Sequence, residues 1–394
     1  MSSDHPETAL PDPDIDPRLR EALGTVQDPE LQRPLLELGM VRRAVLEADG
    51  TAVVGVLLTI SGCPLRGTIE GDVQEALTGV DEVQRVVVEL DVMTPEQREE
   101  LKERLGHTRV IPFAQPDSLT RVHAVASGKG GVGKSSVTAN LAAALAARGR
   151  SVGVVDADIH GFSIPGLFGI DRGPTKVDEM ILPAVVRVPE HARQDTGTPG
   201  SVKVISIGMF TDPHTPVVWR GPLLDRAIEQ FLADVHFGDL DHLLLDLPPG
   251  TGDVAISVAQ KLPRSRVLVV STPQHAAAGI AERAGTLASM TEQTVAGVIE
   301  NMSAMAMPDG SMLELFGAGG GSEIARSLTE RMGYPVDLLG SVPLDVALRE
   351  AGDSGVPLVW SKPSSPAVAA LARIAARIDG PRGLAGKPLG VTPR

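Results

Sequence analysis

Nine residues decide the fold: Ser127-Gly128-Lys129-Gly130-Gly131-Val132-Gly133-Lys134-Ser135. The apolar run Val122 to Ala126 precedes them, and the alanine-rich segment Ser136 to Arg148 follows. A strand, a tight glycine turn and a helix, in that order, form the context in which a Gly-x4-Gly-Lys-Ser pattern binds phosphate. The sequence therefore predicts a phosphate site where the helix begins.

The chemistry of this stretch suits a nucleotide. Its glycines leave backbone amides free to surround an anion, and the helix N-terminus adds the positive end of its dipole. Lys134 is expected to reach the β- and γ-phosphates, and Ser135 to offer its hydroxyl to Mg²⁺. The alternative, a glycine turn that binds nothing, is disfavoured by the strand before it and the helix after it.

Composition limits the classes of function. With 394 residues, the chain is long enough for two domains, and its net charge of −14 disfavours nucleic-acid partners. Its one cysteine, Cys63, excludes an intramolecular disulfide and fits a reducing compartment. No signal-peptide pattern and no apolar run of the ~20 residues that span a bilayer are seen, so we expect a cytoplasmic protein without a membrane partner.

Five regions follow from composition and periodicity. Residues 1–16 are rich in proline and aspartate and are expected to be disordered. A small α/β domain is expected over 17–106, a linker over 107–120, the nucleotide-binding domain over 121–380 and a flexible tail over 381–394. The small domain is predicted to contain helices near Arg18–Val26, Gly67–Leu77 and Pro95–Leu105 and strands at Val41–Leu46, Thr51–Ile60 and Val83–Leu90.

The nucleotide-binding domain alternates apolar strands with helical patterns. The expected strands are Val122–Ala126, Val152–Val155, Val202–Ile207, Leu243–Asp246, Val267–Val270, Val295–Ile299 and Leu338–Val342. Continuous apolar strands separated by helices are typical of a parallel sheet that is covered on both faces. The predicted class is α/β, a P-loop NTPase with a mostly parallel, doubly wound sheet.

Two carboxylate motifs follow strands of this sheet. Asp156 and Asp158 come after one strand, and another strand ends in Asp246 and a turn that contains Gly250. Because ligands of open α/β sheets lie beyond the carboxyl ends of the strands, these groups are expected to face the phosphates. Asp246 would hold Mg²⁺ through its water, and the Gly250 amide would sense the γ-phosphate. His160 has no visible partner and is interpreted as a loop residue.

The second lysine of the loop adds a resemblance. Lys-Gly-Gly-x-Gly-Lys-Ser resembles the deviant Walker A motif of the MinD, ParA and nitrogenase-iron-protein ATPases. The resemblance implies a homodimer in which Lys129 touches the nucleotide of the partner subunit, with Asp158 orienting the attacking water. It also places Asn301 on adenine, and no guanine-binding Asn-Lys-x-Asp segment is present, so ATP is expected. A solvated loop lysine is the alternative for Lys129.

Further motifs point to one branch of this class. They are Asp156-Ala-Asp-Ile-His-Gly-Phe-Ser-Ile-Pro165, Asp246-Leu-Pro-Pro-Gly-Thr-Gly-Asp253, Ser271-Thr-Pro-Gln274, Glu300-Asn-Met302 and Phe316-Gly-Ala-Gly-Gly-Gly321. Together they resemble the Mrp/ApbC family, and residues 17–106 resemble the PaaD-type domain that often precedes it. The resemblance implies a homodimeric ATPase that binds a labile [4Fe-4S] cluster and passes it to apoproteins.

The sequence departs from this family at the cluster ligands. Many members have a Cys-x-x-Cys shortly after Glu-Asn-Met, where this chain has Met307 and Gly310. Thioether or no side chain does not replace thiolate in such a cluster. Cys63, in a Gly-Cys-Pro segment at a predicted helix start, is a candidate iron-sulfur ligand, and a small buried hydrophobe is the alternative.

Two other functions remain open. A nucleotide-switched dimeric adaptor in iron-sulfur assembly, which holds no cluster itself, fits a chain that keeps the Walker residues and lacks the Cys-x-x-Cys. A MinD- or ParA-type positioning ATPase is disfavoured, because the proline- and glycine-rich tail suits no membrane helix and the acidic charge suits no DNA.

Overall fold

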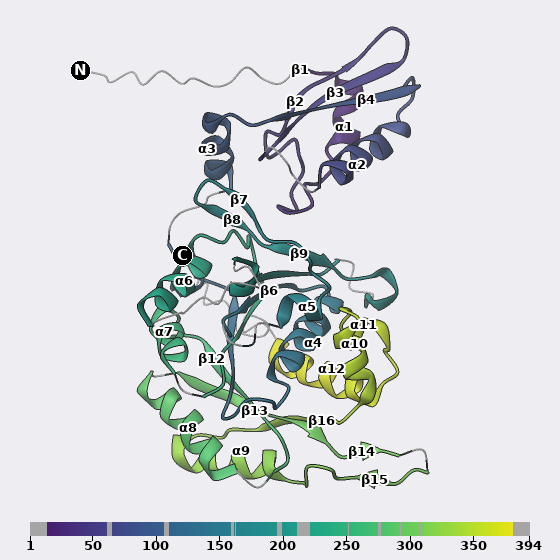
Figure 1. Cartoon of the computed structure of the whole chain (residues 1–394). Helices are drawn as coiled ribbons and strands as arrows, with labels where there is room; N and C mark the ends of the chain where they lie inside the picture. Colours follow the sequence, from purple (N-terminus) through teal and green to yellow (C-terminus); the bar gives the residue numbers. More distant parts are fainter. Residues whose placement is uncertain are drawn as a thin grey trace, which may run out of the picture. The chain divides into compact units, whose positions relative to one another are not determined.

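The computed structural model describes residues 14–60, 65–105, 110–158, 161, 163–194, 199–210, 221–250, 252–274, 277–291, 293–307 and 309–380. Residues 1–13, Cys63, His160 and the tail 381–394, for which the sequence makes predictions, lie outside them. The chain divides into two compact units (Figure 1). The small domain comprises residues 1–109 and 175–182, and the nucleotide domain comprises 110–174 and 183–394.

The small domain is built on a four-stranded sheet in the order β1-β2-β3-β4. Ala52, Val54 and Val56 of β3 alternate along one face and are fully buried, as expected of a sheet that packs on helices. The elements are β1 (Asp14–Ile15), α1 (Pro17–Leu23), β2 (Val41–Leu46), β3 (Thr51–Leu58), α2 (Arg66–Thr78), β4 (Arg85–Val92) and α3 (Pro95–Arg104). The mixed α/β character predicted for this part of the chain is confirmed.

A hairpin from far along the sequence completes the small domain. It consists of β7 (Thr175–Val177) and β8 (Met180–Leu182), which pair antiparallel. Val177 and Met180 are fully buried in the small-domain core. The sequence places these residues within the nucleotide-binding domain, and nothing in their local pattern marks the change of partner.

The nucleotide domain contains an eight-stranded sheet in the order β16-β13-β12-β5-β11-β6-β10-β9. All neighbours are parallel except β9, which pairs antiparallel with β10 at the edge. The strands are β5 (Arg121–Ser127), β6 (Ser151–Asp156), β9 (Ala184–Arg187), β10 (Ser201–Ser206), β11 (His242–Asp246), β12 (Arg266–Ser271), β13 (Thr294–Ser303) and β16 (Leu338–Pro343). The mostly parallel sheet predicted from the apolar runs is confirmed.

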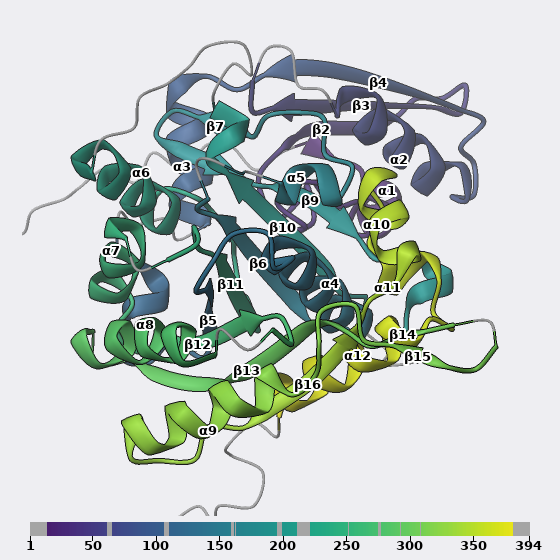
Figure 2. The same ribbon diagram turned by 60° about the horizontal axis from the view of Figure 1, so that its bottom comes forward.

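Helices cover both faces of this sheet. Figure 2 shows α4, α11 and α12 on one face and α6, α7 and α8 on the other. The helices are α4 (Lys134–Ala147), α5 (Ile164–Leu167), α6 (Gly221–Ala233), α7 (Asp253–Lys261), α8 (Ala277–Met290), α9 (Gly320–Met332), α10 (Val346–Asp353), α11 (Leu358–Ser361) and α12 (Pro366–Asp379). In the described part of the chain, none of the helices is both long and apolar enough to cross a membrane.

Residues 110–120, predicted to be a linker, belong to the nucleotide domain. Phe113 explains their attachment, because its ring is 6% exposed and meets the ring of Phe237 edge-on at 5.8 Å between centroids. One apolar side chain among prolines gives no periodic signal. The extended composition therefore hides a segment that is packed.

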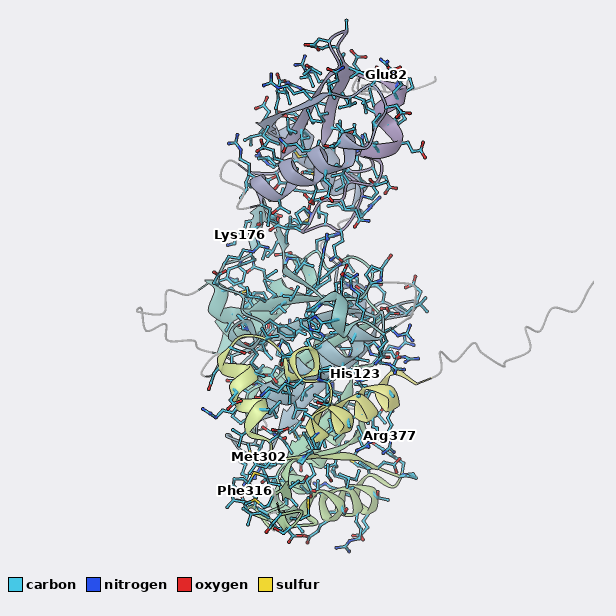
Figure 3. All side chains as sticks on the ribbon, turned by 90° about the vertical axis from the view of Figure 1, so that its right-hand side faces the viewer. Glu82, His123, Lys176, Met302, Phe316 and Arg377 are labelled. Atoms are coloured by element: carbon cyan, nitrogen blue, oxygen red, sulfur yellow. The ribbon has the colours of Figure 1, made fainter. Side chains whose placement is uncertain are left out.

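The amino ends of the central strands hold a buried polar cluster. His123 of β5 and His242 of β11 stack with ring centroids 5.6 Å apart, and His242 Nε2 lies 3.2 Å from Asp379 Oδ1 at the end of α12. Arg150 donates to the same carboxylate at 3.0 Å. Figure 3 marks His123. Burial is the main cause that lowers the pKa of His123 to about 3, with a further contribution from His242.

Candidate nucleotide site

The glycine turn runs from the end of β5 at Ser127 to the start of α4 at Lys134. β5 lies between β11 and β12 in the middle of the sheet. Gly131 and Gly133 both have φ of +76°, a conformation that favours glycine. A Cβ added at Gly133 would also lie 2.3 Å from Asn301 Nδ2, so a larger residue does not fit there. The turn geometry thus depends on a residue at the end of a distant strand.

The side chain of Asn301 holds this turn through a hydrogen bond to its backbone. Its side chain is 2% exposed, and Nδ2 donates to the carbonyl oxygen of Val132 at 2.9 Å. Its Oδ1 is buried without a hydrogen-bond partner among the described residues. The contact with the loop backbone was not predicted from the sequence, which places Asn301 on the base. The free Oδ1 leaves an acceptor of the kind that an adenine amino group would need.

Asp246 gathers the polar groups at the start of α4. Its carboxylate is fully buried, and its Oδ2 accepts from Ser135 Oγ at 2.5 Å. Lys134 Nζ lies 2.7 Å from the same oxygen as an ion pair, at an angle that gives no directed hydrogen bond. The other oxygen, Oδ1, accepts from the buried hydroxyl of Thr138 at 2.8 Å. Lys134, Ser135 and Asp246, singled out from the sequence, therefore lie together, and Thr138 joins them.

Asp156 organises the loop that carries Asp158. Its Oδ2 accepts from the backbone amides of Ser163 and Ile164 at 3.1 and 3.2 Å, and its Oδ1 accepts from the Asp158 amide at 3.2 Å. Burial raises the pKa of Asp156 to about 7, and the neighbouring carboxylate of Asp246 adds to the effect. Asp158 itself is 8% exposed, just beyond the end of β6. Asp156 thus shapes the loop on which Asp158 stands.

Lys129 and Gly250 make contacts within the chain. The Lys129 ammonium donates to the side-chain oxygen of Gln274, which follows β12. The Gly250 amide donates to the carbonyl oxygen of Ser127 at 2.9 Å, and Gly250 has φ of +94°. Both residues therefore adjoin the glycine turn, Lys129 as part of it and Gly250 through its backbone.

The segment after Asn301 forms a second hairpin, β14 (Met305–Ala306) and β15 (Met312–Leu313). Met307 and Gly310, where many members of the resembled family have cysteines, stand at its turn, and the Gly310 amide donates to the Met307 carbonyl oxygen at 2.9 Å. Met312 and Leu315 are about 60% exposed, at 59% and 61%. Across the described ranges, no three or more His, Cys, Asp or Glu side chains are grouped to hold a metal ion.

The Phe316-Gly321 motif closes against β13. The Gly321 amide donates to Glu300 Oε2 at 2.8 Å, and a Cβ at Gly320 would lie 2.6 Å from the Pro273 carbonyl oxygen. Met302, whose φ of +58° is rare for a side-chain-bearing residue, follows Asn301. Figure 3 marks Met302 and Phe316. The motif therefore packs next to the strand end that carries Asn301.

These residues fit a magnesium nucleotide. Serine hydroxyl and carboxylate oxygens are the ligands that Mg²⁺ prefers, and they meet at Ser135 and Asp246. Lys134 Nζ is buried and makes no directed hydrogen bond to any residue that the structure describes, so it has donors left for phosphate oxygens. The glycine turn adds backbone amides at a helix N-terminus. The fold and site define a P-loop nucleotide-binding protein of the α/β class.

Comparison with known families makes this class specific. Residues 118–379 match the NUBPL iron-transfer P-loop NTPase family, and residues 17–90 match an iron-sulfur cluster assembly protein family. The first match covers more than half of the chain, so the chain belongs to the NUBPL-type iron-transfer P-loop NTPases.

Relatives span both domains. The iron-sulfur cluster carrier protein of Mycobacterium tuberculosis is 56% identical over 97% of this chain and 98% of its own length. That of Synechocystis is 38% identical over 91% of this chain and 95% of its own. A solved nucleotide-binding protein from Archaeoglobus fulgidus, in complex with ADP, is 35% identical and covers 66% of this chain and 91% of its own, with a TM-score of 0.48.

Proposed function

We propose that this chain is an ATP-hydrolysing carrier that binds an iron-sulfur cluster and transfers it to apoproteins. The observation that carries the ATPase part is the meeting of Lys134 and Ser135 with Asp246 at the start of α4. The carrier part is supported by membership of the iron-transfer family. It is also supported by similarity, over nearly their whole length, to relatives named iron-sulfur cluster carrier protein. We expect the protein to act in the cytoplasm as a homodimer.

Each residue of the nucleotide site then has a role. Lys134 would exchange its ion pair with Asp246 for the β- and γ-phosphates, and Ser135 and Asp246 would hold Mg²⁺, the latter through water. When bound there, Mg²⁺ would supply positive charge against the charge that develops on the phosphate oxygens. The backbone from Gly128 to Gly133 surrounds the phosphates, and Asn301 keeps that backbone in place through Val132 while its Oδ1 accepts from adenine.

Hydrolysis and dimer closure involve the two remaining residues. Asp158 orients the attacking water, and Asp156 holds its loop in position. Lys129 leaves Gln274 and reaches the nucleotide of the partner subunit, so that ATP closes the dimer. Hydrolysis then releases the Gly250 turn and reopens the dimer for cluster transfer.

The cluster is cargo, and Cys63 is its candidate protein ligand. A dimer of this chain contains two thiols, one Cys63 from each subunit. Two thiolates suffice for a cluster that an external ligand completes, and fall two short of four protein thiolates for a [4Fe-4S] cluster. Cys63 lies outside the described residues, so its candidacy stands on the sequence alone.

Two substitutions test the nucleotide site. Lys134→Ala is expected to weaken ATP binding at least ~100-fold, because a buried cation on the phosphates is lost. Lys362→Ala, which removes an exposed lysine paired with Glu350, is the matched control and should leave the affinity unchanged. Calorimetric titration with a non-hydrolysable analogue measures both. An unaltered affinity in Lys134→Ala would remove the basis for the site.

Asp158→Ala separates binding from turnover. The variant is expected to bind ATP with near wild-type affinity and to hydrolyse it about 100-fold more slowly or worse, since the group that orients the water is gone. Phosphate release under saturating ATP measures the rate. A variant that turns over at the wild-type rate would return this role to another residue.

Iron and acid-labile sulfide per dimer test the cargo. Wild type and Cys63→Ala are reconstituted anaerobically and compared by metal content and visible spectrum. A cluster that is present in wild type and lost in the variant supports the carrier and names its ligand. If neither binds iron while ATP still turns over, the carrier role is wrong for this chain.

The second hairpin favours a second candidate, a nucleotide-switched adaptor that holds no cluster. Met307 and Gly310 offer no thiolate, and Met312, Leu313 and Leu315 are exposed apolar side chains next to them. Such side chains suit contact with another protein. The iron measurement separates the two candidates, since the adaptor predicts ATP turnover without iron.

A further inference from the structure

Thr138 stands out because the nucleotide chemistry described so far leaves it without a role. It is fully buried in α4, four residues after Lys134 and three after Ser135, so its side chain is a neighbour of each of them along the helix. Its hydroxyl lies 2.8 Å from Asp246 Oδ1. No motif marks this position, and a threonine in an alanine-rich helix gives no signal of its own in the sequence.

The hydroxyl has two acceptors for one proton. The Lys134 carbonyl oxygen lies 3.0 Å away, the usual back-bond of a helical threonine, and the Asp246 carboxylate lies at 2.8 Å. The Lys134 carbonyl already has the helical amide of Thr138 as a donor. A hydrogen bond to an ionised acceptor is about twice as strong as one to a neutral acceptor. The Thr138 hydroxyl therefore donates its hydrogen bond to Asp246 Oδ1.

This bond fixes the carboxylate at one end and leaves the other for the site. Oδ1 is occupied by Thr138, while Oδ2 faces both Ser135 and Lys134. When Lys134 turns to the phosphates and Ser135 to Mg²⁺, Asp246 loses both of its other side-chain contacts on Oδ2. Among the described residues, Thr138 is then the side chain that still donates a hydrogen bond to the carboxylate and holds its plane.

We infer that Thr138 is a positioning residue for the magnesium site: it holds the Asp246 carboxylate so that Oδ2 stays directed at Ser135, where Mg²⁺ would bind. This inference rests on the proposed nucleotide binding. Outer-shell partners of metal ligands typically change metal affinity about 10- to 100-fold when they are removed. The effect of Thr138 should therefore appear in the Mg²⁺ dependence and be absent when no Mg²⁺ is present.

The test compares Thr138→Val, which keeps the shape and removes the hydroxyl, with Thr138→Ser, which keeps the hydroxyl. ADP binding is titrated in EDTA and over a range of Mg²⁺ concentrations. For Thr138→Val we expect a rise of about tenfold in the Mg²⁺ concentration that gives half of the Mg²⁺-dependent increase in ADP affinity. ADP affinity in EDTA should stay within about twofold, and Thr138→Ser should restore the wild-type Mg²⁺ dependence.

Two outcomes would overturn the inference: an unchanged Mg²⁺ dependence in Thr138→Val, or an equal loss of ADP affinity with and without Mg²⁺. Asp246→Asn with and without Thr138→Ala provides a second measurement that does not need the valine variant to fold. If Thr138 acts through the carboxylate, adding Thr138→Ala to Asp246→Asn should not change the Mg²⁺ dependence of ADP binding any further. Failure of wild type to bind ADP at all would instead refute the proposed function.

Discussion

The two domains build their interiors in opposite ways. The nucleotide domain surrounds β5 and α4 with strands and helices from its own two stretches of chain, and its site residues come from the ends of four of its strands and the start of α4. The small domain is incomplete over residues 14–105, because Val177, Met180 and Leu182 of the β7–β8 hairpin lie in its core. A domain that is continuous in sequence is therefore not a complete packing unit here.

Polar contacts join the hairpin to the small domain in addition to its apolar side chains. Thr175 Oγ1 donates to Glu30 Oε1 at 2.6 Å, and Asp178 accepts from Arg98 at 3.1 Å and pairs with Lys102 at 3.0 Å. The chain enters this hairpin a few residues after α5, whose first amide is bound by Asp156. Along the chain, only the short helix α5 and the segment that follows it separate the loop that carries Asp158 from the hairpin β7–β8.

The largest expected effect breaks the small domain without touching the nucleotide site. Met180→Ala removes a fully buried side chain and should cost about 3 kcal/mol of unfolding free energy in the small domain. Trp360 is 3% exposed in the core of the nucleotide domain, so its fluorescence, measured in a Trp219→Phe background, follows that domain alone. Circular dichroism follows both domains. We expect the dichroism to show an earlier transition while the fluorescence transition stays in place.

Met312→Ala is the matched control for this comparison. The same substitution in the other hairpin removes a side chain that is 59% exposed and should change the unfolding free energy by less than about 0.5 kcal/mol. If the two methionine variants unfold alike, or if Met180→Ala shifts the fluorescence transition as much as the dichroism, the hairpin does not belong to the small-domain core.

The same contrast explains what the sequence can predict. The glycine turn, the strands that end in Asp156 and Asp246 and the helices of residues 17–105 are local patterns, and the structure has them within a few residues. The hairpin 175–182, the packing of Phe113 and the contact of Asn301 with Val132 join residues that are far apart in the chain. Each depends on which surfaces meet in three dimensions, and composition gives no record of that.

Low pH is expected to lower the unfolding free energy of the nucleotide domain through His123, an effect smaller than that of Met180→Ala. Because burial holds the pKa of His123 at about 3, the unfolded chain gains a proton near pH 6.5 that the folded nucleotide domain does not. Stability from His123 is therefore present above pH 6.5 and falls as the pH drops towards 3, by about 2 kcal/mol at pH 5. No histidine occurs among residues 14–105, so this loss belongs to the nucleotide domain.

His123→Phe isolates this contribution, since it keeps a ring against His242 and has no proton to gain. Asp156, whose raised pKa gives the opposite sign over the same range, is common to both proteins and cancels in the difference. Unfolding by urea, followed by tryptophan fluorescence at pH 7.5 and pH 5, measures it. An acid loss that is equal in wild type and variant would assign the effect to another group.

The smallest expected effect asks how far the nucleotide site depends on a distant strand of its own domain. Asn301→Ala removes the donor to Val132 and should weaken binding of inorganic triphosphate roughly fivefold, the value of one neutral hydrogen bond. ATP should lose more than triphosphate, because Asn301 Oδ1 is also expected to accept from adenine. Competition against a fluorescent nucleotide measures both ligands. Unchanged triphosphate binding would confine Asn301 to the base, and equal losses for the two ligands would confine it to the glycine turn.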